Sequence, residues 1–206
     1  MRHYPMFRIN FLKSLAAFAL VIFSFNSSAG EVDAKTYITN LTTELQQALQ
    51  TGLEQGLLGD DAYLDTVIDE HILPHVDQEY LSRRVFHPRW EDIAAANKTD
   101  EAQEAVISSL RRTYRVALNA YNGQKIDIGN SRDKPKFSVV RVKVHTTNNA
   151  HLMDFALRQQ EGEWRVFDLS VDGVVFSKTL NGAIRRNLES DDVDNVINSI
   201  RPDTES

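Results

Sequence analysis

The sequence predicts an α+β fold: a curved antiparallel sheet of about four strands packs against helices from both ends of the chain and encloses an apolar cavity. Apolar residues recur at three- and four-residue steps from residue 31 to about residue 122 and again after residue 176, as in amphipathic helices. Between these segments apolar and polar residues alternate, as in strands with one buried face. No repeat or linker interrupts this order, so we expect one domain over residues 30–201 and a disordered tail over residues 202–206.

The helices before the sheet are placed by their apolar stripes and by residues that start or end helices. The stripes of the first two are Ile38, Leu41, Leu45 and Leu49, and then Leu64, Val67, Ile68 and Ile72. Pro74 is expected to end or kink the second helix, and Asp77 is suited to cap the start of a short third one. The longest helix is predicted from about Thr99–Asp100, where Asp100 with Gln103 resembles a capping box, to Asn122–Gly123.

The strands are predicted after Gly123. Apolar and polar residues alternate over residues 140–145 and 153–158, and a turn at residues 160–162 leads into a strand over residues 164–171. A short segment over residues 125–128 is able to add another strand. Helical spacing then returns in two stripes: Leu180, Ile184 and Leu188, and Val193, Val196, Ile197 and Ile200.

The first 29 residues predict export from a bacterial cytoplasm. Three basic residues and no acid precede an apolar run over residues 15–25, and Ser27-Ser28-Ala29 offers a small-residue site for cleavage after Ala29. The apolar run is about half the ~20 residues that span a bilayer, so an uncleaved membrane anchor is the less favoured alternative.

The composition of the remaining chain excludes several classes of function. Removal of residues 1–29 leaves 20 Lys and Arg against 29 Asp and Glu, a formal charge of −9, which disfavours nucleic-acid binding. The chain has no cysteine, so it forms no disulfide and uses neither thiol catalysis nor cysteine-ligated metals. Nothing in the sequence points to a cofactor.

A few polar residues are candidates for a catalytic or metal site. His71 and His75 have the spacing of a zinc site, but Pro74 lies between them and no Glu follows His71, so we expect surface or capping histidines. Two acidic pairs, Asp60-Asp61 and Asp191-Asp192, stand where helices should begin and are explained by capping. Asp168 lies inside an apolar strand and is the one candidate for a buried catalytic base, although a hydrogen bond to a neighbouring loop is the favoured explanation.

Three blocks of residues keep an order and spacing found in one known family. They are ILPHVD at residues 72–77 with the helix to Trp90, LRRTY to YNGQK at residues 110–125, and WRVFD at residues 164–168 with DGV at residues 172–174. They resemble the MlaC family, the Ttg2-type or toluene tolerance proteins that bind phospholipid in the periplasm. The chain departs from the family with Asp172-Gly173-Val174-Val175 in place of Glu-Gly-Val-Ser, and with Leu180 and Ile184 in place of aromatic residues.

This resemblance implies a monomeric periplasmic carrier without catalytic residues. Such a carrier holds phospholipid acyl chains between sheet and helices and shuttles the lipid between the outer and inner membranes, which maintains outer-membrane lipid asymmetry. The implied partners are an outer-membrane lipoprotein–porin complex and an inner-membrane MCE-domain protein with its ABC transporter.

The apolar periodicity suggests which residues would line the lipid site. The helical wall is predicted to hold Val67, Ile68, Leu110, Tyr114 and Leu118, and the sheet wall Val142, Val144, Phe155, Val166 and Val174. Each of these residues could instead belong to an ordinary core. The alternatives to a phospholipid carrier are a small exported α+β enzyme that uses Asp168, a carrier of another lipid such as a hopanoid, and a periplasmic adaptor with a closed core.

Overall fold

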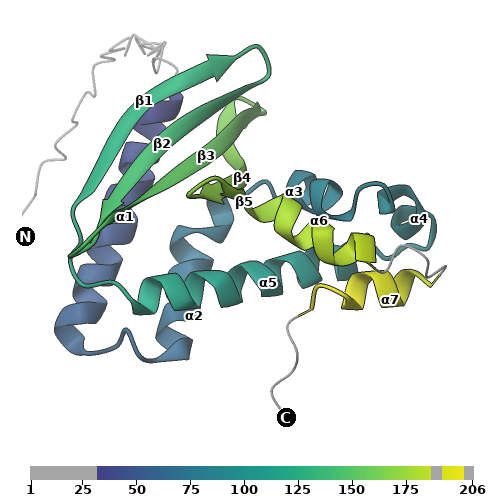
Figure 1. The fold of residues 1–206 in the computed structure, drawn as a ribbon, viewed down its shortest axis with the longest axis horizontal. Helices are drawn as coiled ribbons and strands as arrows, with labels where there is room; N and C mark the ends of the chain where they lie inside the picture. Colours follow the sequence, from purple (N-terminus) through teal and green to yellow (C-terminus); the bar gives the residue numbers. More distant parts are fainter. Residues whose placement is uncertain (1–31, 187–191, 202–206) are drawn as a thin grey trace, which may run out of the picture. The chain divides into compact units, whose positions relative to one another are not determined.

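The computed structural model describes residues 32–186 and 192–201, and the helix–sheet–helix order predicted from the sequence is confirmed (Figure 1). The predicted signal peptide, Asp191 and the predicted tail lie outside the described residues. The helices are α1 (Ala34–Gln55), α2 (Asp61–His71), the 3₁₀ turn η1 (Leu73–His75), α3 (Gln78–Phe86), α4 (Trp90–Ala95), α5 (Thr99–Asn119), α6 (Phe176–Arg186) and α7 (Val193–Asn198). The strands are β1 (Ile126–Lys134), β2 (Phe137–His145), β3 (Ala150–Gln160), β4 (Glu163–Val171) and β5 (Val174–Val175).

Aspartate side chains cap several helices. Four of them accept a backbone N–H from the first turn of the helix that follows: Asp33, Asp60, Asp77 and Asp192. The expected N-cap at Asp77 is confirmed, since its carboxylate accepts the N–H of Tyr80 at 3.1 Å. Capping likewise explains Asp60 and Asp192 without any catalytic role. Among the helices of the described residues, none is both long enough and apolar enough to cross a membrane.

The start of α5 agrees with the prediction, while its cap and its end differ. The helix begins at Thr99 after Lys98, which makes no side-chain cap, so the capping box proposed at Asp100 is wrong. Asp100 lies instead in the first turn, where a negative charge is favoured by the helix dipole. The helix ends at Asn119, before the predicted stop, and Gly123 with a φ of 68° lies in the turn that leads to β1.

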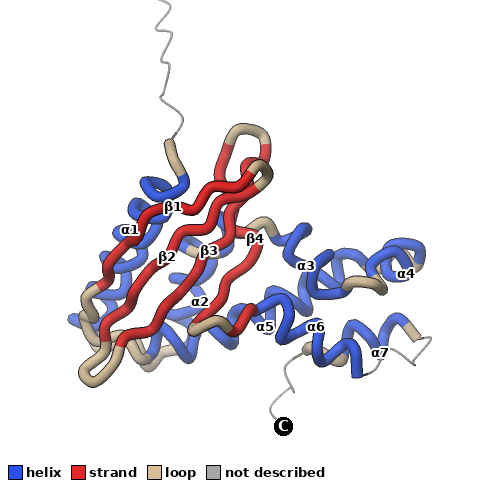
Figure 2. Tube along the Cα trace, turned by 45° about the horizontal axis from the view of Figure 1, so that its top comes forward, coloured by secondary structure: helices blue, strands red, loops and turns tan. Residues whose placement is uncertain are grey.

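The four predicted strands are confirmed and a short fifth one is added, in an antiparallel sheet of order β1-β2-β3-β4-β5 (Figure 2). The additional strand, β5, has only two residues, so its sequence cannot show the alternation of apolar and polar residues that predicts a strand. The first strand is also longer than expected and reaches Lys134, because its second half pairs with β2 although it lacks apolar alternation. The turn after β3 is confirmed: Glu161 and Gly162 have φ values of 54° and 84°, as a two-residue hairpin requires.

Two bulges interrupt the regular pairing. In β1 one extra residue stands between Ile128 and Ser131, and a Cβ on Gly129 would lie 2.9 Å from the carbonyl oxygen of Arg141. In β4 the extra residue is Phe167, because Leu157 pairs with Val166 while Ala156 pairs with Asp168. A bulge reorients the side chains beside it. As a result three consecutive residues of β4, from Val166 to Asp168, are all buried.

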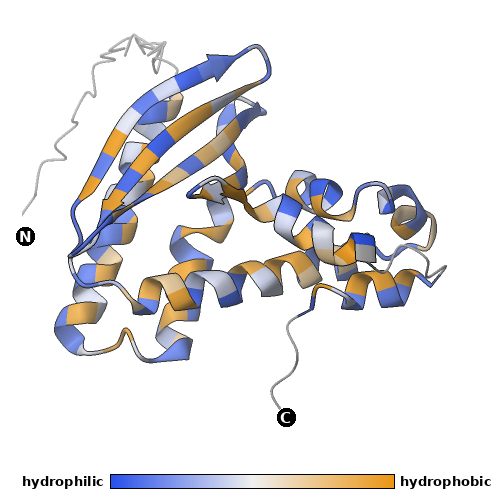
Figure 3. Cartoon of the chain, in the orientation of Figure 1, coloured by the Kyte–Doolittle hydropathy of each residue, from blue (hydrophilic) through white to orange (hydrophobic). Residues whose placement is uncertain are grey.

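The buried apolar residues form two clusters. The larger joins α2, α3, α4, α5, α6 and α7 around fully buried residues such as Phe86 and Ile93. The smaller joins the start of α1 to β2, β3 and β4 around Ile38, Val140 and Leu157. Figure 3 shows the apolar stripe of α5 and the alternation along β2 that supply these clusters.

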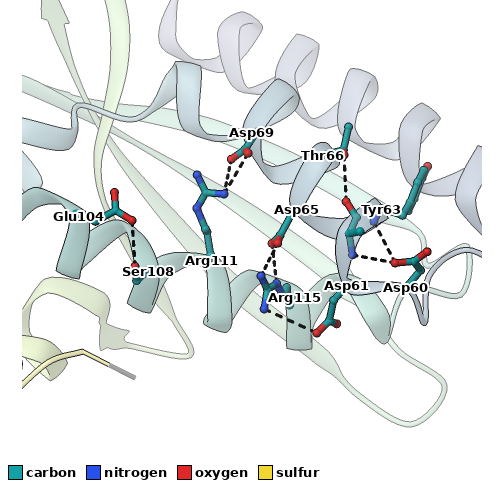
Figure 4. A network of polar contacts seen from close by, with 11 residues as sticks. Asp60, Asp61, Tyr63, Asp65, Thr66, Asp69, Glu104, Ser108, Arg111 and Arg115 are labelled. Carbon is teal, nitrogen blue, oxygen red and sulfur yellow. Dashed lines mark hydrogen bonds and ion pairs between the residues drawn. The ribbon is translucent and has the colours of Figure 1, made fainter. Parts of the chain in front are cut away.

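A row of ion pairs fastens α2 to α5 (Figure 4). Arg111 pairs with Asp69 at 2.8 Å, and Arg115 binds both oxygens of Asp65, with its Nε 2.6 Å from one of them. The three acids Asp61, Asp65 and Asp69 are four residues apart and therefore share one face of α2. This row fixes the position of α5 relative to α2.

Candidate functional site

A pocket of about 400 Å³ lies between α1, the C-terminal half of α5 and the inner face of the sheet. The α1 side is lined by Ile38, Leu41, Thr42, Leu45 and Leu49, and the α5 side by Tyr114, Ala117, Leu118, Ala120 and Tyr121. The sheet side is lined by Ile126, Val142, Val144, Met153, Phe155, Val166 and Val171. Few polar side chains reach it: Thr42, His75, Gln124, Thr146 and His151, besides the two tyrosines.

The pocket lies where the two apolar clusters fail to meet. Ile38, Val142 and Val166 of the sheet cluster line it on one side, and Leu49 and Leu118 of the helical cluster line it on the other. Protein interiors are normally packed without voids larger than a water molecule. A hollow of this size between two well-packed clusters therefore has room for an apolar ligand.

A smaller lobe of about 80 Å³ continues the pocket between α5 and β4. The two hollows share six lining residues: Val76, Tyr114, Ala117, Met153, Val166 and Val171. The lobe reaches Leu110 on α5 and Phe176 at the start of α6. Pocket and lobe therefore adjoin each other along α5, and besides Tyr114 the polar residues in the lining of the lobe are Thr113 and Asp168.

The pocket opens to solvent between α5 and the ends of β2 and β4. Ala117, Thr146 and Val171 line it and are also exposed. At this opening Nδ1 of His151 lies 2.7 Å from the carboxylate of Asp172, which also accepts the N–H of Leu152 at 2.9 Å. The hydrogen bond from His151 lowers the pKa of Asp172 below its ordinary value. His151 and Asp172 thus place polar groups at the opening of a mostly apolar pocket.

Two titratable groups in the wall are held neutral by burial. Burial raises the pKa of Tyr114 to about 12. It lowers the pKa of His75, whose Nδ1 lies 2.7 Å from the hydroxyl oxygen of Tyr37 on α1. The wall therefore carries no charge at neutral pH at these positions, which suits an apolar ligand.

The structure brings most of the predicted lipid-site residues to this space. Six of them line the pocket, namely Tyr114, Leu118, Val142, Val144, Phe155 and Val166, and Leu110 lines the adjoining lobe. Val67 and Ile68 do not, because they are buried in the helical cluster where α2 packs on α5. Val174 does not either, since it is the first residue of β5 and is 64% exposed.

The wall supplied by α1 is not among the predicted lipid-site residues. The spacing from Ile38 to Leu49 predicts a helix, whereas the predicted helical wall consists of residues on α2 and α5. Nothing in the spacing distinguishes a stripe that faces a pocket from one that faces a core. The missing information was which helix crosses the sheet.

Asp168 is held by hydrogen bonds and an ion pair to neighbouring segments of the chain. Its carboxylate pairs with Arg84 at 2.9 Å and accepts the hydroxyl of Ser177 at 2.6 Å and the backbone N–H of Ser177 at 3.2 Å. These contacts tie α3 and the start of α6 to β4, and they occupy both carboxylate oxygens. The interpretation of Asp168 as a residue that binds a neighbouring segment agrees with this geometry.

Comparison with known proteins gives consistent matches. The model of the family described as MlaC protein matches residues 36–202. The toluene tolerance protein ttg2D of Pseudomonas putida is 28% identical over 166 residues, which cover 78% of this chain and 76% of that protein. The intermembrane phospholipid transport system binding protein MlaC of Haemophilus influenzae is 28% identical over 134 residues, which cover 62% of this chain and 60% of that protein.

A solved structure shares the fold. It is the phospholipid-binding protein of Ralstonia solanacearum in complex with a phospholipid, with a TM-score of 0.68 and 20% sequence identity. The match covers 75% of this chain and 89% of that one.

Proposed function

This chain belongs to the MlaC protein family, and from that premise we propose that it binds a phospholipid with the acyl chains inside the pocket and the headgroup at the opening. The observation that carries the proposal is the hollow of about 400 Å³ with an almost wholly apolar lining. The phospholipid held by the Ralstonia solanacearum protein of the same fold supports it, as does the phospholipid transport system for which the Haemophilus influenzae relative is named.

The energetics of acyl chains explain why a protein pocket is needed. Each buried methylene is worth about 0.8 kcal/mol, or roughly 13 kcal/mol for a sixteen-carbon chain, so a lipid leaves a membrane for water only rarely. A pocket that replaces the membrane needs apolar volume and an opening, and no catalytic group. Tyr114, Val144 and Phe155 supply such a surface on opposite walls.

The place of action that we propose is the periplasm. Residues 1–29 direct export and are cleaved after Ala29, and the mature chain carries phospholipid between the outer and inner membranes as a monomer. Its partners are an outer-membrane lipoprotein–porin complex and an inner-membrane MCE-domain protein with its ABC transporter. The resemblance to the family supports these partners, and this exchange maintains the lipid asymmetry of the outer membrane.

A carrier is favoured over the alternative enzyme by the state of Asp168. A catalytic base needs a free oxygen within reach of the substrate. Both oxygens of Asp168 are occupied by Arg84, Ser177 and the backbone. The replacement Asp168→Asn is therefore expected to affect stability and not lipid occupancy.

The proposal is tested by extraction of the protein purified from its own periplasm, followed by mass spectrometry of the organic phase. We expect stoichiometric phospholipid. A stoichiometric hopanoid or other lipid in place of phospholipid would show that the protein carries that lipid instead. The absence of any lipid would contradict the carrier function and favour the periplasmic adaptor with a closed core.

Two pocket variants locate the lipid. Val144→Trp and Phe155→Trp place a larger ring in the pocket and should lower phospholipid occupancy while the protein still folds. The matched control is Val116→Trp on α5, at a residue that is 72% exposed and does not line the pocket. Unchanged occupancy in both pocket variants would show that the lipid binds elsewhere.

A further inference from the structure

A separate hollow of about 430 Å³ lies beside the β1–β2 hairpin. It is at the far end of these strands from the opening of the pocket, since Lys134 pairs with Phe137 at one end and Ile126 pairs with Val144 at the other. Its lining consists of Tyr80, Lys134, Pro135, Lys136, Phe137, Arg158 and Phe167. Apart from Pro135, every lining side chain is aromatic or basic, in a chain whose formal net charge is −6.

Three aromatic rings form the floor of this hollow. Phe167, the bulged residue of β4, meets Tyr80 edge to face with ring centres 5.3 Å apart and Phe137 with ring centres 6.1 Å apart. Such perpendicular pairs are a favoured aromatic geometry. Phe137 remains 39% exposed, so the floor presents an apolar surface to solvent.

The basic groups around the floor differ in how firmly they are held. Arg158 donates from Nε to the buried carboxylate of Asp77, and its guanidinium carbon lies 4.2 Å from the centre of the Tyr80 ring. Within the part of the chain that the structure describes, no ion pair involves Lys134 or Lys136, which flank Pro135 in the hairpin turn. The nearest acid on β1, Asp133, accepts the hydroxyls of Ser131 and Ser138.

We propose that this hollow is a docking site for an acidic segment of a partner protein. The segment inserts an apolar or aromatic side chain against Phe137 and Tyr80, and its carboxylates lie beside Lys134 and Lys136. Charge complementarity of this kind gives specificity and fast association, while the aromatic contact supplies the buried area. The proposal does not depend on the ligand of the pocket.

The shape and charge of the region favour a protein segment over a membrane surface. The hollow is concave, so it receives a protruding side chain, whereas a flat bilayer surface would touch only its rim. Two lysines without an ion pair among the described residues attract an anionic bilayer weakly. The surplus of acids over the whole chain opposes that attraction.

The test is a selection of random peptides displayed on phage. The library is selected on the purified protein and counter-selected on the K134E/K136E variant. We expect the surviving peptides to be rich in Asp and Glu beside an aromatic or large apolar residue, and to bind the variant about tenfold more weakly. The matched control K143E/K178E changes the charge equally at two other exposed lysines and should keep the affinity of the unaltered protein.

A second variant, Phe137→Ala, removes the exposed ring and should also weaken the selected peptides. Circular dichroism establishes that all three variants are folded. Peptides without an excess of acidic residues, or equal weakening in K134E/K136E and K143E/K178E, would overturn the proposal. Flotation of the protein with vesicles of phosphatidylethanolamine and phosphatidylglycerol that requires Lys134 and Lys136 would overturn it as well, since the surface would then bind membrane.

Discussion

Arg84 donates two hydrogen bonds to a single oxygen of Asp168, from Nε at 3.2 Å and from Nη2 at 2.9 Å. The aspartate side chain is 5% exposed and that of the arginine is 35% exposed, so the pair connects the interior with the surface. The same carboxylate accepts the hydroxyl of Ser177, and one aspartate thereby joins α3, β4 and α6.

The Asp168→Ala substitution should lower the free energy of unfolding by about 3 kcal/mol, because it leaves Arg84 and Ser177 without their shared acceptor in a buried site. Urea denaturation measures the change. The matched control is Glu79→Ala on α3, whose exposed pair with Arg83 should contribute at most about 1 kcal/mol. Equal losses in the two variants would contradict a structural role for Asp168.

Two helical glycines should respond in opposite directions to alanine. A Cβ on Gly52 of α1 would lie 2.5 Å from the ring of Tyr63, whose hydroxyl donates to the carbonyl of Ala48 at 2.7 Å. We expect Gly52→Ala to destabilise the protein by about 1 to 3 kcal/mol through this overlap. A Cβ on Gly182 of α6 meets nothing within 4 Å, so Gly182→Ala should stabilise by up to about 1 kcal/mol. Thermal unfolding of both variants checks the two signs, and a stabilising Gly52→Ala would show that Tyr63 moves aside freely.

The Asp65–Arg115 pair between α2 and α5 should couple measurably and in a salt-dependent manner. The two side chains are 30% and 35% exposed, so a double-mutant cycle with alanine at both positions should give a coupling energy of about 0.5 to 1 kcal/mol. The coupling should shrink at 1 M salt, where the Debye length is about 3 Å. A coupling energy that does not change with salt would mean that packing, and not charge, joins these helices.

His75 should make the protein less stable in mild acid. Burial lowers its pKa in the folded state. Glu44 raises this pKa by a smaller amount, and the positive charges of Arg165 and His71 lower it slightly further. Below about pH 6.5 the unfolded chain therefore takes up a proton that the folded chain resists, so the free energy of unfolding falls as the pH decreases from about 7. Above about pH 7 His75 is neutral in both the folded and the unfolded chain, so it causes no loss of stability there.

Urea unfolding at pH 7.5 and pH 5.5 measures this effect. His75→Phe should lose less stability between the two pH values than the unaltered protein, because its ring has nothing to protonate. His87→Gln at an exposed position serves as the matched control and should lose as much as the unaltered protein. If His75→Phe lost as much stability between the two pH values as the unaltered protein, protonation of His75 would not be the cause of the acid sensitivity.

The helices and the turns were predictable from the sequence because their causes are local. The stripe from Ile38 to Leu49 depends only on the helical period, and the cap at Asp77 depends on one side chain and the first turn of α3. The turn at Glu161–Gly162 likewise follows from the residues within it.

The walls of the pocket were only partly predictable because they depend on tertiary packing. Val67 and Ile68 have the same apolar character as Leu45 and Leu49, yet α2 packs on α5 while α1 crosses the sheet. The bulge at Phe167 was not predictable either, since alternation along β4 fails at one residue and no residue type requires it.

The bulge in β1 has a consequence for how copies of the chain meet. An open sheet has two edges whose free backbone groups can accept a strand from another molecule, which is a common route to aggregation. One edge is β1, which is interrupted near Gly129 and carries the charges of Asp127, Arg132, Asp133 and Lys134. The other edge is β4, where β5 pairs with only the last two residues, the bulge at Phe167 breaks the pairing, and the carbonyl of Val166 accepts the N–H of Asp77. Neither edge is a long, regular template, so the sheet resists growth by strand addition.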